Sequence, residues 1–296
     1  MTSPPDAPPR VTVIMATYNW ATVLPYSIGS VIDQTFTDFE LLVIGDGCTD
    51  ESEAVVDAIS DERVRWHNLA ENVGHQSAAN NEGLRQARAS ISAYIGHDDV
   101  WLPHHLELLL ASIDGGADVV FSNALLPGID GTFRLRPTPN ASWPPGTWVP
   151  PTTMMHRTTL AQTVGGWRMP NETGSIDPEA DLLQRMVSVV GSPVWIPRLT
   201  AVKLSAAKRE NVYRDRPFHE QAAWLERIRA AHDPEAELLA LSEPSEMERV
   251  RRSRSRARRV LRVVRRRVRR ARRGPKRTAE ERWRNNRRFK GLEESG

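Results

Sequence analysis

Hydrophobic residues in the first 122 positions form short continuous runs, and a longer stretch with apolar residues at helical spacing follows each run. Continuous rather than alternating apolar runs are typical of strands that are buried on both faces of a parallel sheet. The repeated strand–helix order therefore predicts an α/β fold with a doubly wound, mostly parallel sheet flanked by helices. The predicted strands are residues 11–15, 39–44, 64–67, 91–95 and 117–122, and the predicted helices are residues 21–34, 50–60, 77–89 and 103–113.

The pattern is less regular between residues 125 and 151, where seven prolines and two tryptophans, Trp143 and Trp148, occur. We interpret this stretch as β structure and loops that lie over a cleft. Beyond it the apolar pattern becomes regular again. It predicts strands at residues 149–155, 194–196 and 199–204, a short helix that ends at residue 164, and helices at residues 177–190, 217–232 and 235–241.

Polar side chains directly follow three of the predicted strands. Tyr18 follows the first strand, Asp46 the second, and the pair Asp98 and Asp99 the fourth. In an open parallel sheet ligands bind beyond the carboxyl ends of the strands, so we expect these groups at one edge. Carboxylate oxygens suit Mg²⁺ or Mn²⁺, which proteins often share with substrate phosphates. Helix capping is the alternative role for an Asp-Asp pair, but the convergence of three polar groups favours a binding site.

Charged residues are divided unevenly along the chain. Residues 1–248 contain 18 Lys and Arg against 33 Asp and Glu, whereas residues 249–296 contain 22 against 4. An acidic body therefore carries a basic tail, whose expected partner is anionic: lipid headgroups, nucleic acid or the body itself. A narrow apolar stripe, about 100° wide, in residues 249–277 fits an amphipathic helix that lies on a membrane surface.

Cysteine content and hydropathy exclude several classes of protein. Cys48 is the single cysteine, which excludes an internal disulfide and a Cys-based zinc site and fits a reducing compartment. No apolar run approaches the roughly 18 residues that a membrane-spanning helix needs. Residues 1–10 are proline-rich and contain no apolar stretch, so we expect no secretory signal there. Together these features favour a cytoplasmic protein.

Seven short motifs occur in a fixed order along the chain. They are Val-Thr-Val-Ile-Met-Ala-Thr-Tyr-Asn (11–19), Ser-Val-Ile-Asp-Gln-Thr-Phe-Thr-Asp-Phe-Glu-Leu-Leu-Val-Ile-Gly-Asp-Gly-Cys-Thr-Asp (30–50), Asn-Val-Gly-His-Gln-Ser-Ala-Ala-Asn-Asn-Glu-Gly (72–83), Tyr-Ile-Gly-His-Asp-Asp (94–99), Met-Met-His-Arg (154–157), Gly-Gly-Trp (165–167) and Glu-Ala-Asp-Leu-Leu-Gln-Arg (179–185). The series covers about residues 10–205 and resembles the family 2 glycosyltransferases, the inverting enzymes of the GT-A fold. The basic tail lies outside this resemblance.

The resemblance implies roles for the polar groups at the strand ends. Tyr18 matches the aromatic residue that packs against the nucleotide base, with Ala16 beside it, and Asp46 matches the acid that hydrogen-bonds uracil. Asp98 and Asp99 match the carboxylates that serve the ribose, the diphosphate and a metal ion. Asp99 is the more direct metal ligand in this comparison, and the ion is Mn²⁺ or Mg²⁺.

The acceptor half has its own candidate residues. Glu179 lies six residues before Arg185, where the family usually places its catalytic aspartate, and Asp181 is the alternative base. A base is needed to take the proton of the acceptor hydroxyl, and a metal ion to balance the charge of the departing nucleoside diphosphate. Acids enriched at a helix N-terminus are the structural alternative for both residues. His156 is a candidate for the acceptor or diphosphate pocket, with a structural histidine as the alternative.

Three positions depart from the usual residues of the family. Gly45 replaces the first acid of the Asp-Asp-Gly-Ser motif, and Gly96 replaces the first acid of Asp-x-Asp. Glu179 is longer than the usual aspartate by one methylene. Some family members share the reduced Asp-x-Asp form, so a metal site is still expected here.

We therefore expect an inverting, metal-dependent glycosyltransferase that moves a sugar from a nucleotide donor to an acceptor hydroxyl. The expected donor is a UDP-sugar, and the expected acceptor is a glycan or a lipid-linked molecule. The expected organisation is a disordered N-terminus (1–10), a GT-A domain (11–243) and an arginine-rich, partly amphipathic helical tail (244–296). The domain divides into a nucleotide half, about 11–122, and an acceptor half, about 123–243.

The tail is expected to hold the protein at the anionic inner face of the cell membrane, in cell-envelope or polysaccharide synthesis. Nucleic acid is the less favoured partner, because no zinc-finger or helix-turn-helix pattern occurs. Two other functions remain as alternatives. One is a sugar nucleotidyltransferase, and the other is a nucleic-acid-associated protein with a degenerate α/β body.

Overall fold

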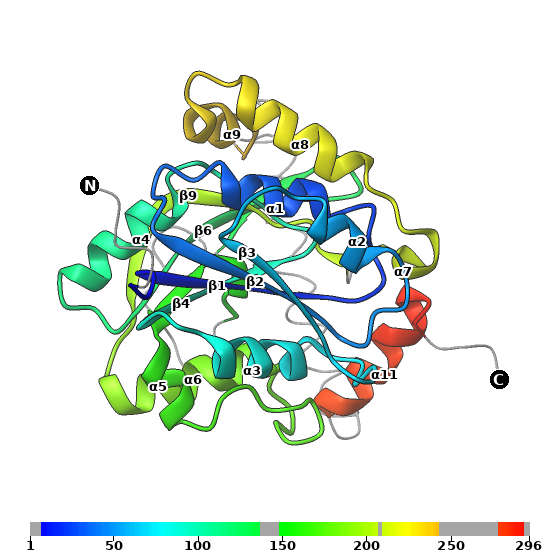
Figure 1. Cartoon of the computed structure of the whole chain (residues 1–296), viewed down its shortest axis with the longest axis horizontal. Coiled ribbons are helices and arrows are strands. Elements are labelled where there is room, and N and C mark those ends of the chain that lie inside the picture. Colours follow the sequence, from blue (N-terminus) through cyan, green and yellow to red (C-terminus); the bar gives the residue numbers. More distant parts are fainter. Residues whose placement is uncertain (1–6, 137–147, 207–208, 243–277, 293–296) are drawn as a thin grey trace, which may run out of the picture.

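A computed structural model describes residues 7–136, 148–206, 209–242 and 278–292. The expectations for residues 1–6 and for the amphipathic helix at 249–277 lie outside these ranges. Within them, nine strands form one sheet in the order β3-β2-β1-β4-β8-β6-β9-β5, with β7 paired to β6 (Figure 1). Arg10, at the end of the stretch expected as disordered, forms an ion pair of 2.7 Å with Asp114.

The first half of the sheet is parallel. It contains β1 (Val11–Thr17), β2 (Phe39–Gly45), β3 (Val64–Asn68) and β4 (Ile91–Gly96). In the register of these strands, Val13 lies opposite Leu41 on one side and Ala93 on the other. Residues of β1, β2 and β4 are buried along almost their whole length, as the continuous apolar runs predicted. The parallel order makes all four strands end at the same edge.

The second half of the sheet is mixed. It contains β5 (Val100–Trp101), β6 (Val119–Pro127), β7 (Phe133–Arg136), β8 (Met154–Arg157) and β9 (Val194–Val202). Strand β8 lies between β4 and β6 and runs antiparallel to both, whereas β9 is parallel to β6. The strands predicted at 194–196 and 199–204 are one strand, β9. Local apolar patterns do not show that a later strand is inserted between two earlier ones, because that choice depends on long-range pairing.

Helices cover both faces of the sheet, and alternate residues of β1 show how. Val13 and Met15 pack with helices α1 and α4. Ile14, together with Tyr94 of β4, packs with α3, α5 and α6 on the other face. Figure 1 shows α3, α5 and α6 together on one side of the sheet, and α1 and α2 on the other. The helices are α1 (Leu24–Ile32), α2 (Ser52–Asp57), α3 (Gln76–Gln86), α4 (His105–Asp114), α5 (Thr158–Thr163), α6 (Pro178–Val190), α7 (Val212–Asp215), α8 (His219–Ala230) and α9 (Pro234–Ser242), with a 3₁₀ turn, η1 (Pro151–Thr153).

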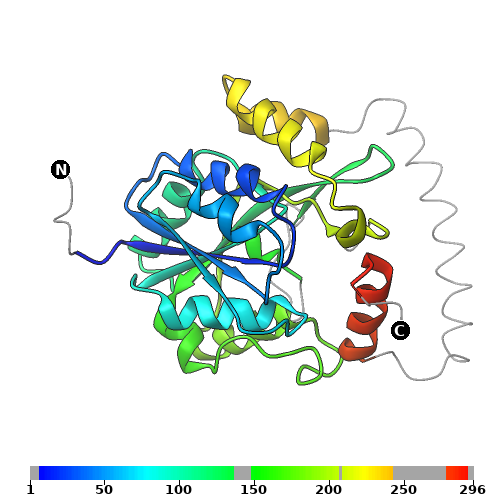
Figure 2. The same ribbon diagram turned by 45° about the vertical axis from the view of Figure 1, so that its right-hand side comes forward.

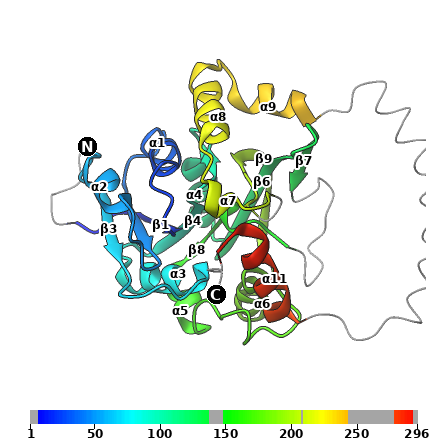
Figure 3. The same cartoon turned by 90° about the vertical axis from the view of Figure 1, so that its right-hand side faces the viewer.

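One further helix, α11 (Ala279–Lys290), comes from the basic end of the chain. It begins with a capping box, in which Thr278 and Glu281 bond to each other's backbone N–H, and it ends at Gly291. Figure 2 shows α11, in red, beside the edge where the parallel strands end, and Figure 3 shows it between α7 and α6. The basic tail therefore contacts the protein's own body, at least through residues 278–292.

In the described parts of the chain, no helix combines the length and the apolar character that a membrane crossing requires.

Candidate functional site

A cleft of about 500 Å³ opens at the edge where β1, β2 and β4 end. Its wall comes from the ends of these strands, the loop before α3, the segment of Trp148 and Pro151, the loop after α5, the start of α6, the end of β9, helix α7 and helix α11. The residues that line it are Ala16, Thr17, Tyr18, Asp46, Asn72, Gly74, His75, Gln76, Gly96, His97, Asp98, Trp148, Pro151, Pro170, Asp177, Pro178, Glu179, Lys203, Ser205, Ala206, Tyr213, Arg282, Trp283, Asn286, Arg287, Lys290 and Leu292.

Five of the residues predicted from the sequence line this cleft together: Ala16, Tyr18, Asp46, Asp98 and Glu179. They come from the two halves of the domain, and the longest sequence separation among them joins Ala16 to Glu179. The other three predicted residues, Asp99, Asp181 and His156, do not line the cleft. Each of these three is held by other parts of the protein, as described below.

The loop after β1 is fixed by Asn19, the residue that follows Tyr18. Its backbone lies in the left-handed region, with φ at 43°. The Asn19 Oδ1 accepts hydrogen bonds from the backbone N–H groups of Thr49 (2.7 Å) and Asp50 (3.3 Å). These bonds tie the loop after β1 to the loop after β2, because a short amide side chain in this conformation can bond to nearby backbone. Tyr18 is thereby held at the rim of the cleft.

Asp46 fixes the loop that precedes α3. The carboxylate of Asp46 accepts hydrogen bonds from the backbone N–H groups of Val73 (2.9 Å) and Gly74 (2.7 Å). Burial raises the pKa of Asp46 and these two bonds partly lower it again. Both carboxylate oxygens thus have a backbone partner in this structure. A nucleotide base that hydrogen-bonds to Asp46 would have to share these carboxylate oxygens with the two N–H groups or replace one of those groups.

The pair Asp98 and Asp99 is divided between the cleft and the interior. Asp99 is fully buried, and its oxygens accept from Lys203 Nζ at 2.8 and 3.1 Å and from the backbone N–H of Leu204 at 3.1 Å. Burial by itself lowers the pKa of Lys203, but the carboxylates of Asp99 and Asp98 outweigh it and raise that pKa. Lys203 therefore stays charged at neutral pH. Asp98 is the member of the pair that faces the cleft.

Gly96 leaves room for this arrangement. A Cβ added at Gly96 would lie 2.6 Å from one oxygen of Asp99 and 3.1 Å from one of Asp98. Gly45 is also closely packed. A Cβ added there would approach the Asn68 amide and lie 2.8 Å from the Trp66 ring. An acid at either position would require its neighbours to move, so the two departures from the family pattern are matched by the packing around them.

A divalent metal ion fits only part of this residue set. Among the described residues no group of three or more His, Cys, Asp or Glu side chains converges on one point. Asp98 remains as a cleft carboxylate, and Mg²⁺ commonly uses one or two carboxylates together with substrate phosphates. The sequence-based choice of Asp99 as the direct ligand is not supported, because Lys203 and Leu204 occupy its oxygens.

Glu179 lines the same cleft from the first turn of α6. The indole Nε1–H of Trp148 donates a hydrogen bond of 2.8 Å to its carboxylate. Burial raises the pKa of Glu179 above its ordinary value, and the bond from Trp148 offsets part of this rise. A carboxylate with a raised pKa accepts a proton more readily than an exposed one, which suits a general base.

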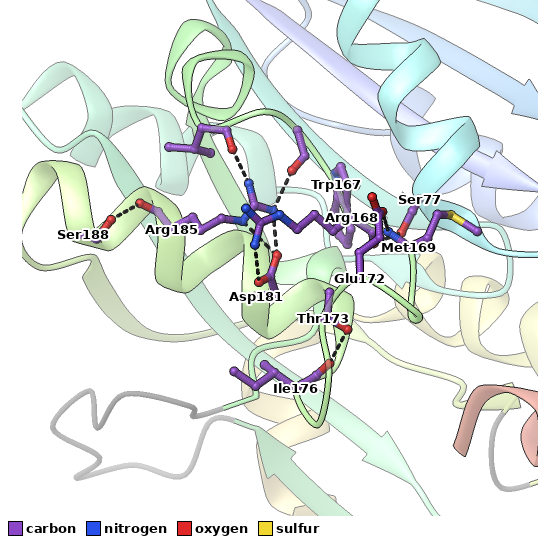
Figure 4. Close-up of polar contacts among 12 residues, drawn as sticks. Ser77, Trp167, Arg168, Met169, Glu172, Thr173, Ile176, Asp181, Arg185 and Ser188 are labelled. Carbon is purple, nitrogen blue, oxygen red and sulfur yellow. Dashed lines mark hydrogen bonds and ion pairs between the residues drawn. The ribbon is translucent and has the colours of Figure 1, made fainter. Parts of the chain in front are cut away.

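Asp181 has a structural role in this geometry (Figure 4). Its carboxylate accepts from Arg185 Nε at 2.8 Å and lies 3.5 Å from a guanidinium nitrogen of Arg168. Arg185 also donates to the carbonyl oxygens of Val164 and Gly166. Asp181 and Arg185 therefore hold α6 against the loop that follows α5. The alternative base expected at Asp181 is not placed in the cleft.

His156 belongs to the core. It lies on β8, its Nδ1 is 2.8 Å from the backbone oxygen of Arg157, and its Nε2 is 3.1 Å from the hydroxyl of Tyr94. Burial lowers the pKa of His156 to about 4, so the ring is neutral at pH 7. His156 was expected at the acceptor or diphosphate pocket, but it does not line the cleft, because β8 is an interior strand of the sheet.

Several cleft residues could not be selected from the sequence. Lys203 and Tyr213 lie in segments without a motif, and Lys290 and Arg287 lie in the basic tail, where arginines are too frequent to stand out. The Tyr213 hydroxyl lies 3.3 Å from His97 Nε2. The Thr278–Glu281 capping pattern, together with the change to a mixed composition after residue 277, is the signal that could have located α11.

The sequence model of glycosyl transferase family 2 matches residues 12–175, which is more than half of the chain. The chain belongs to glycosyl transferase family 2. The matched region contains the ends of β1, β2 and β4 and the loop before α3, and it stops just before the start of α6. Neither Glu179 nor helix α11 is therefore part of the match.

Curated relatives agree with this assignment. An uncharacterized glycosyltransferase, alr2836, of a Nostoc species is 31% identical over 126 residues, which are 42% of this chain and 39% of the relative. The Escherichia coli UDP-Glc:alpha-D-GlcNAc-diphosphoundecaprenol beta-1,3-glucosyltransferase WfgD is 32% identical over 101 residues, 34% of this chain and 40% of the relative. The chain thus spans about two fifths of the length of these relatives.

Solved structures of low sequence identity show the same fold. Residues 1–349 of S. aureus TarS, in complex with UDP-GlcNAc, superpose with a TM-score of 0.54 at 16% identity over 79% of this chain and 70% of that one. The mannosyltransferase PcManGT from Pyrobaculum calidifontis, in complex with GDP-Man and Mn²⁺, superposes with a TM-score of 0.52 at 17% identity over 80% of both chains. The predicted GT-A fold is confirmed.

Proposed function

We propose that the protein is an inverting glycosyltransferase that moves a sugar from a nucleotide donor to an acceptor hydroxyl. The observation that carries this proposal is that Asp98 and Glu179 line one cleft. Asp98 follows β4 within the region matched by the family, and Glu179 lies at the start of α6, beyond it. A donor phosphate beside Asp98 and an acceptor hydroxyl beside Glu179 would then meet in the same cavity.

The proposed chemistry follows from these positions. Glu179 accepts the proton of the acceptor hydroxyl while the hydroxyl oxygen bonds to the anomeric carbon of the donor sugar. The bond from that carbon to the diphosphate oxygen breaks on the opposite face, so the configuration inverts and a nucleoside diphosphate leaves. Trp148 holds the Glu179 carboxylate in position with its 2.8 Å hydrogen bond.

The metal requirement is part of the proposal. A Mn²⁺ or Mg²⁺ ion bound together with the donor would supply positive charge next to the leaving diphosphate. Asp98 is the residue that would hold it from the protein side, with phosphate oxygens as further ligands. Asp99 would support Asp98 through the bonds that fix the loop between β4 and β5.

The names of relatives support a UDP-sugar donor and a lipid-linked acceptor. The E. coli relative is named for UDP-Glc and a diphosphoundecaprenol-linked sugar. A relative from Campylobacter jejuni, 31% identical over 121 residues, is named a GalNAc(5)-diNAcBac-PP-undecaprenol beta-1,3-glucosyltransferase. An acceptor carried on a lipid diphosphate suits an enzyme of cell-envelope or polysaccharide synthesis. A panel of nucleotide sugars with different bases is the direct test of the donor.

The test of the whole proposal measures release of nucleoside diphosphate from each nucleotide sugar, with Mn²⁺, Mg²⁺ or a chelator. We expect one donor to be consumed, and Glu179→Gln to reduce the rate by roughly 10²- to 10⁴-fold, because the general base is lost. Glu226→Gln, an exposed acid on α8, is the matched control and should retain full activity. If no donor is bound or consumed, or if Glu179→Gln is as active as the control, the proposal is wrong.

We also propose a peripheral location at the inner face of the cell membrane, supported by the sequence of residues 249–277. This stretch carries 17 Lys and Arg and the apolar stripe described above. The full-length protein should sediment with vesicles that contain phosphatidylglycerol and not with vesicles of phosphatidylcholine alone. Replacing Arg265, Arg266 and Arg267 together by serine should weaken sedimentation. Equal sedimentation of this variant and the unaltered protein would exclude this role for the stretch.

The two alternative functions gain no support. A sugar nucleotidyltransferase generally needs a glycine-rich loop with Arg or Lys after the first strand, and Ala16-Thr17-Tyr18-Asn19 is not such a loop. A degenerate nucleic-acid-binding body is not favoured by a cleft that contains four acids: Asp46, Asp98, Asp177 and Glu179.

A further inference from the structure

Helix α11 reaches both halves of the domain across the cleft. On the nucleotide side, the Trp283 Nε1–H donates to the backbone oxygen of Gly74 at 3.2 Å, and the Trp283 ring packs edge-on against His75 with centroids 6.4 Å apart. The Arg287 guanidinium lies directly against Gly74, where a Cβ would collide with it. The same loop, residues 72–75, is the one that Asp46 fixes through Val73 and Gly74.

On the acceptor side, α11 is anchored at both of its ends. Near its start, Arg282 donates to Asp177 at 3.0 Å and to the backbone oxygen of Ser175 at 2.8 Å. Near its end, the backbone N–H of Asn211 donates to the Phe289 oxygen at 2.7 Å. Asp177 is two residues from Glu179, so the helix is attached next to the proposed base. Helix α11 is thus a strap across the cleft, and Figure 3 shows it beside α6 and α7.

The strap brings positive charge into the cleft. Lys290 is partly exposed as a whole residue, but its ammonium lies deep among protein atoms, and the Asp98 and Glu179 carboxylates and the Lys203 ammonium act on it. Among the described residues none accepts a hydrogen bond from the Lys290 ammonium or forms an ion pair with it. The Tyr213 ring lies 5.7 Å from it. An ammonium that is buried without an anionic partner is unfavourable, so this position favours a ligand that supplies negative charge.

Arg287 is a second cation in the same wall. Its guanidinium lies 5.3 Å from the centre of the Trp283 ring and close enough to Asp46 to lower the pKa of that carboxyl. Lys203, by contrast, is already paired with Asp99. Among the residues that the structure describes, the cleft cations without a direct carboxylate partner, Arg287 and Lys290, therefore come from α11.

We propose that Lys290 and Arg287 bind the diphosphate of the nucleotide donor, so that helix α11 completes the donor site of this protein. The inference rests on the proposed function, since it takes the donor to be a nucleoside diphosphate sugar. A diphosphate carries two or more negative charges and accepts charge-assisted hydrogen bonds from both ammonium and guanidinium groups. Both residues lie outside residues 12–175, the region matched by the family.

The test compares substitutions that remove one charge from the same helix. Lys290→Gln and Arg287→Gln remove cations of the cleft, whereas Arg284→Gln removes a charge that is exposed and paired with Glu280. Binding of UDP and of uridine is measured by calorimetry with the full-length protein. We expect each cleft variant to lower the affinity for UDP by roughly tenfold or more, while the affinity for uridine is unchanged. Arg284→Gln should bind both as the unaltered protein does.

Lys290→Arg is a further control, because it keeps the charge and should retain most of the UDP affinity that Lys290→Gln loses. Far-UV circular dichroism and thermal unfolding verify that each variant is folded. If Lys290→Gln and Arg287→Gln bind UDP as tightly as Arg284→Gln does, the inference is wrong although the transferase proposal stands. If the unaltered protein binds no nucleoside diphosphate and consumes no donor, the transferase proposal itself fails.

Discussion

The cleft has an acidic pair on each side, and the two pairs are built alike. At the end of β4, Asp98 faces the cleft while Asp99 is buried against Lys203. At the start of α6, Glu179 faces the cleft while Asp181 is held by Arg185. In each pair one carboxylate is open to ligands, and its neighbour fixes the backbone that presents it.

The two pairs differ in what surrounds the open carboxylate. Asp98 interacts more strongly than Glu179 with the ammonium groups of Lys203 and Lys290, although both carboxylates interact with them. Glu179 accepts from Trp148, a neutral donor, and its pKa is raised by burial. The first environment suits a site for phosphates, and the second suits a residue that takes up a proton. Under the proposed function, this difference fits a donor phosphate beside Asp98 and an acceptor hydroxyl beside Glu179.

The largest effect on stability is expected for Asp99→Asn. The substitution leaves the Lys203 ammonium buried without its ion pair, which should lower the free energy of unfolding by about 3–5 kcal/mol. Chemical denaturation measures the change. Asp98→Asn is the matched control, because it leaves that ion pair intact and should change stability by less than about 1 kcal/mol. Equal losses for the two variants would show that the pair is not divided as described.

A smaller loss is expected for Asp181→Asn. Arg185 keeps its bonds to the carbonyl oxygens of Val164 and Gly166, so the free energy of unfolding should fall by about 1–3 kcal/mol. Transfer activity per folded molecule should stay close to that of the unaltered protein, in contrast to Glu179→Gln. Loss of transfer in Asp181→Asn with unchanged stability would mean that Asp181 is the base and that the comparison of the two pairs is wrong.

The smallest effect is a change in pH dependence. A general base acts when it is deprotonated, so activity falls as the pH drops through the pKa of Glu179. Trp148 lowers that pKa by donating to the charged carboxylate, and Trp148→Phe should therefore raise it and move the acidic limb of the kcat/KM profile to higher pH. Trp224→Phe, on α8, is the control with the same substitution away from the cleft. An unshifted limb in Trp148→Phe would remove Glu179 as the titrating group.

Sequence reasoning found the two carboxylates that face the cleft, Asp98 and Glu179, but did not separate them from their neighbours Asp99 and Asp181, which do not line it. Asp98 and Asp99 are adjacent, and Glu179 and Asp181 are two residues apart, so the motif alone does not show which of them faces a ligand. The buried partners decide this: Lys203 lies 104 positions after Asp99 in the chain, a separation over which no local pattern extends. His156 was expected at the site because its motif matches the family, but β8 is an interior strand.

The sequence by itself determined the parallel half of the sheet and the edge at which the cleft lies. Continuous apolar runs define buried strands, and residues that directly follow parallel strands must meet at one edge. Only the tertiary structure decided the rest of the cleft wall. Strand β8 lies between β4 and β6, Lys203 pairs with Asp99 in the interior, and α11, which follows the arginine-rich stretch, places Lys290 near Asp98. These contacts depend on packing and charge pairing between distant segments, which local periodicity does not encode.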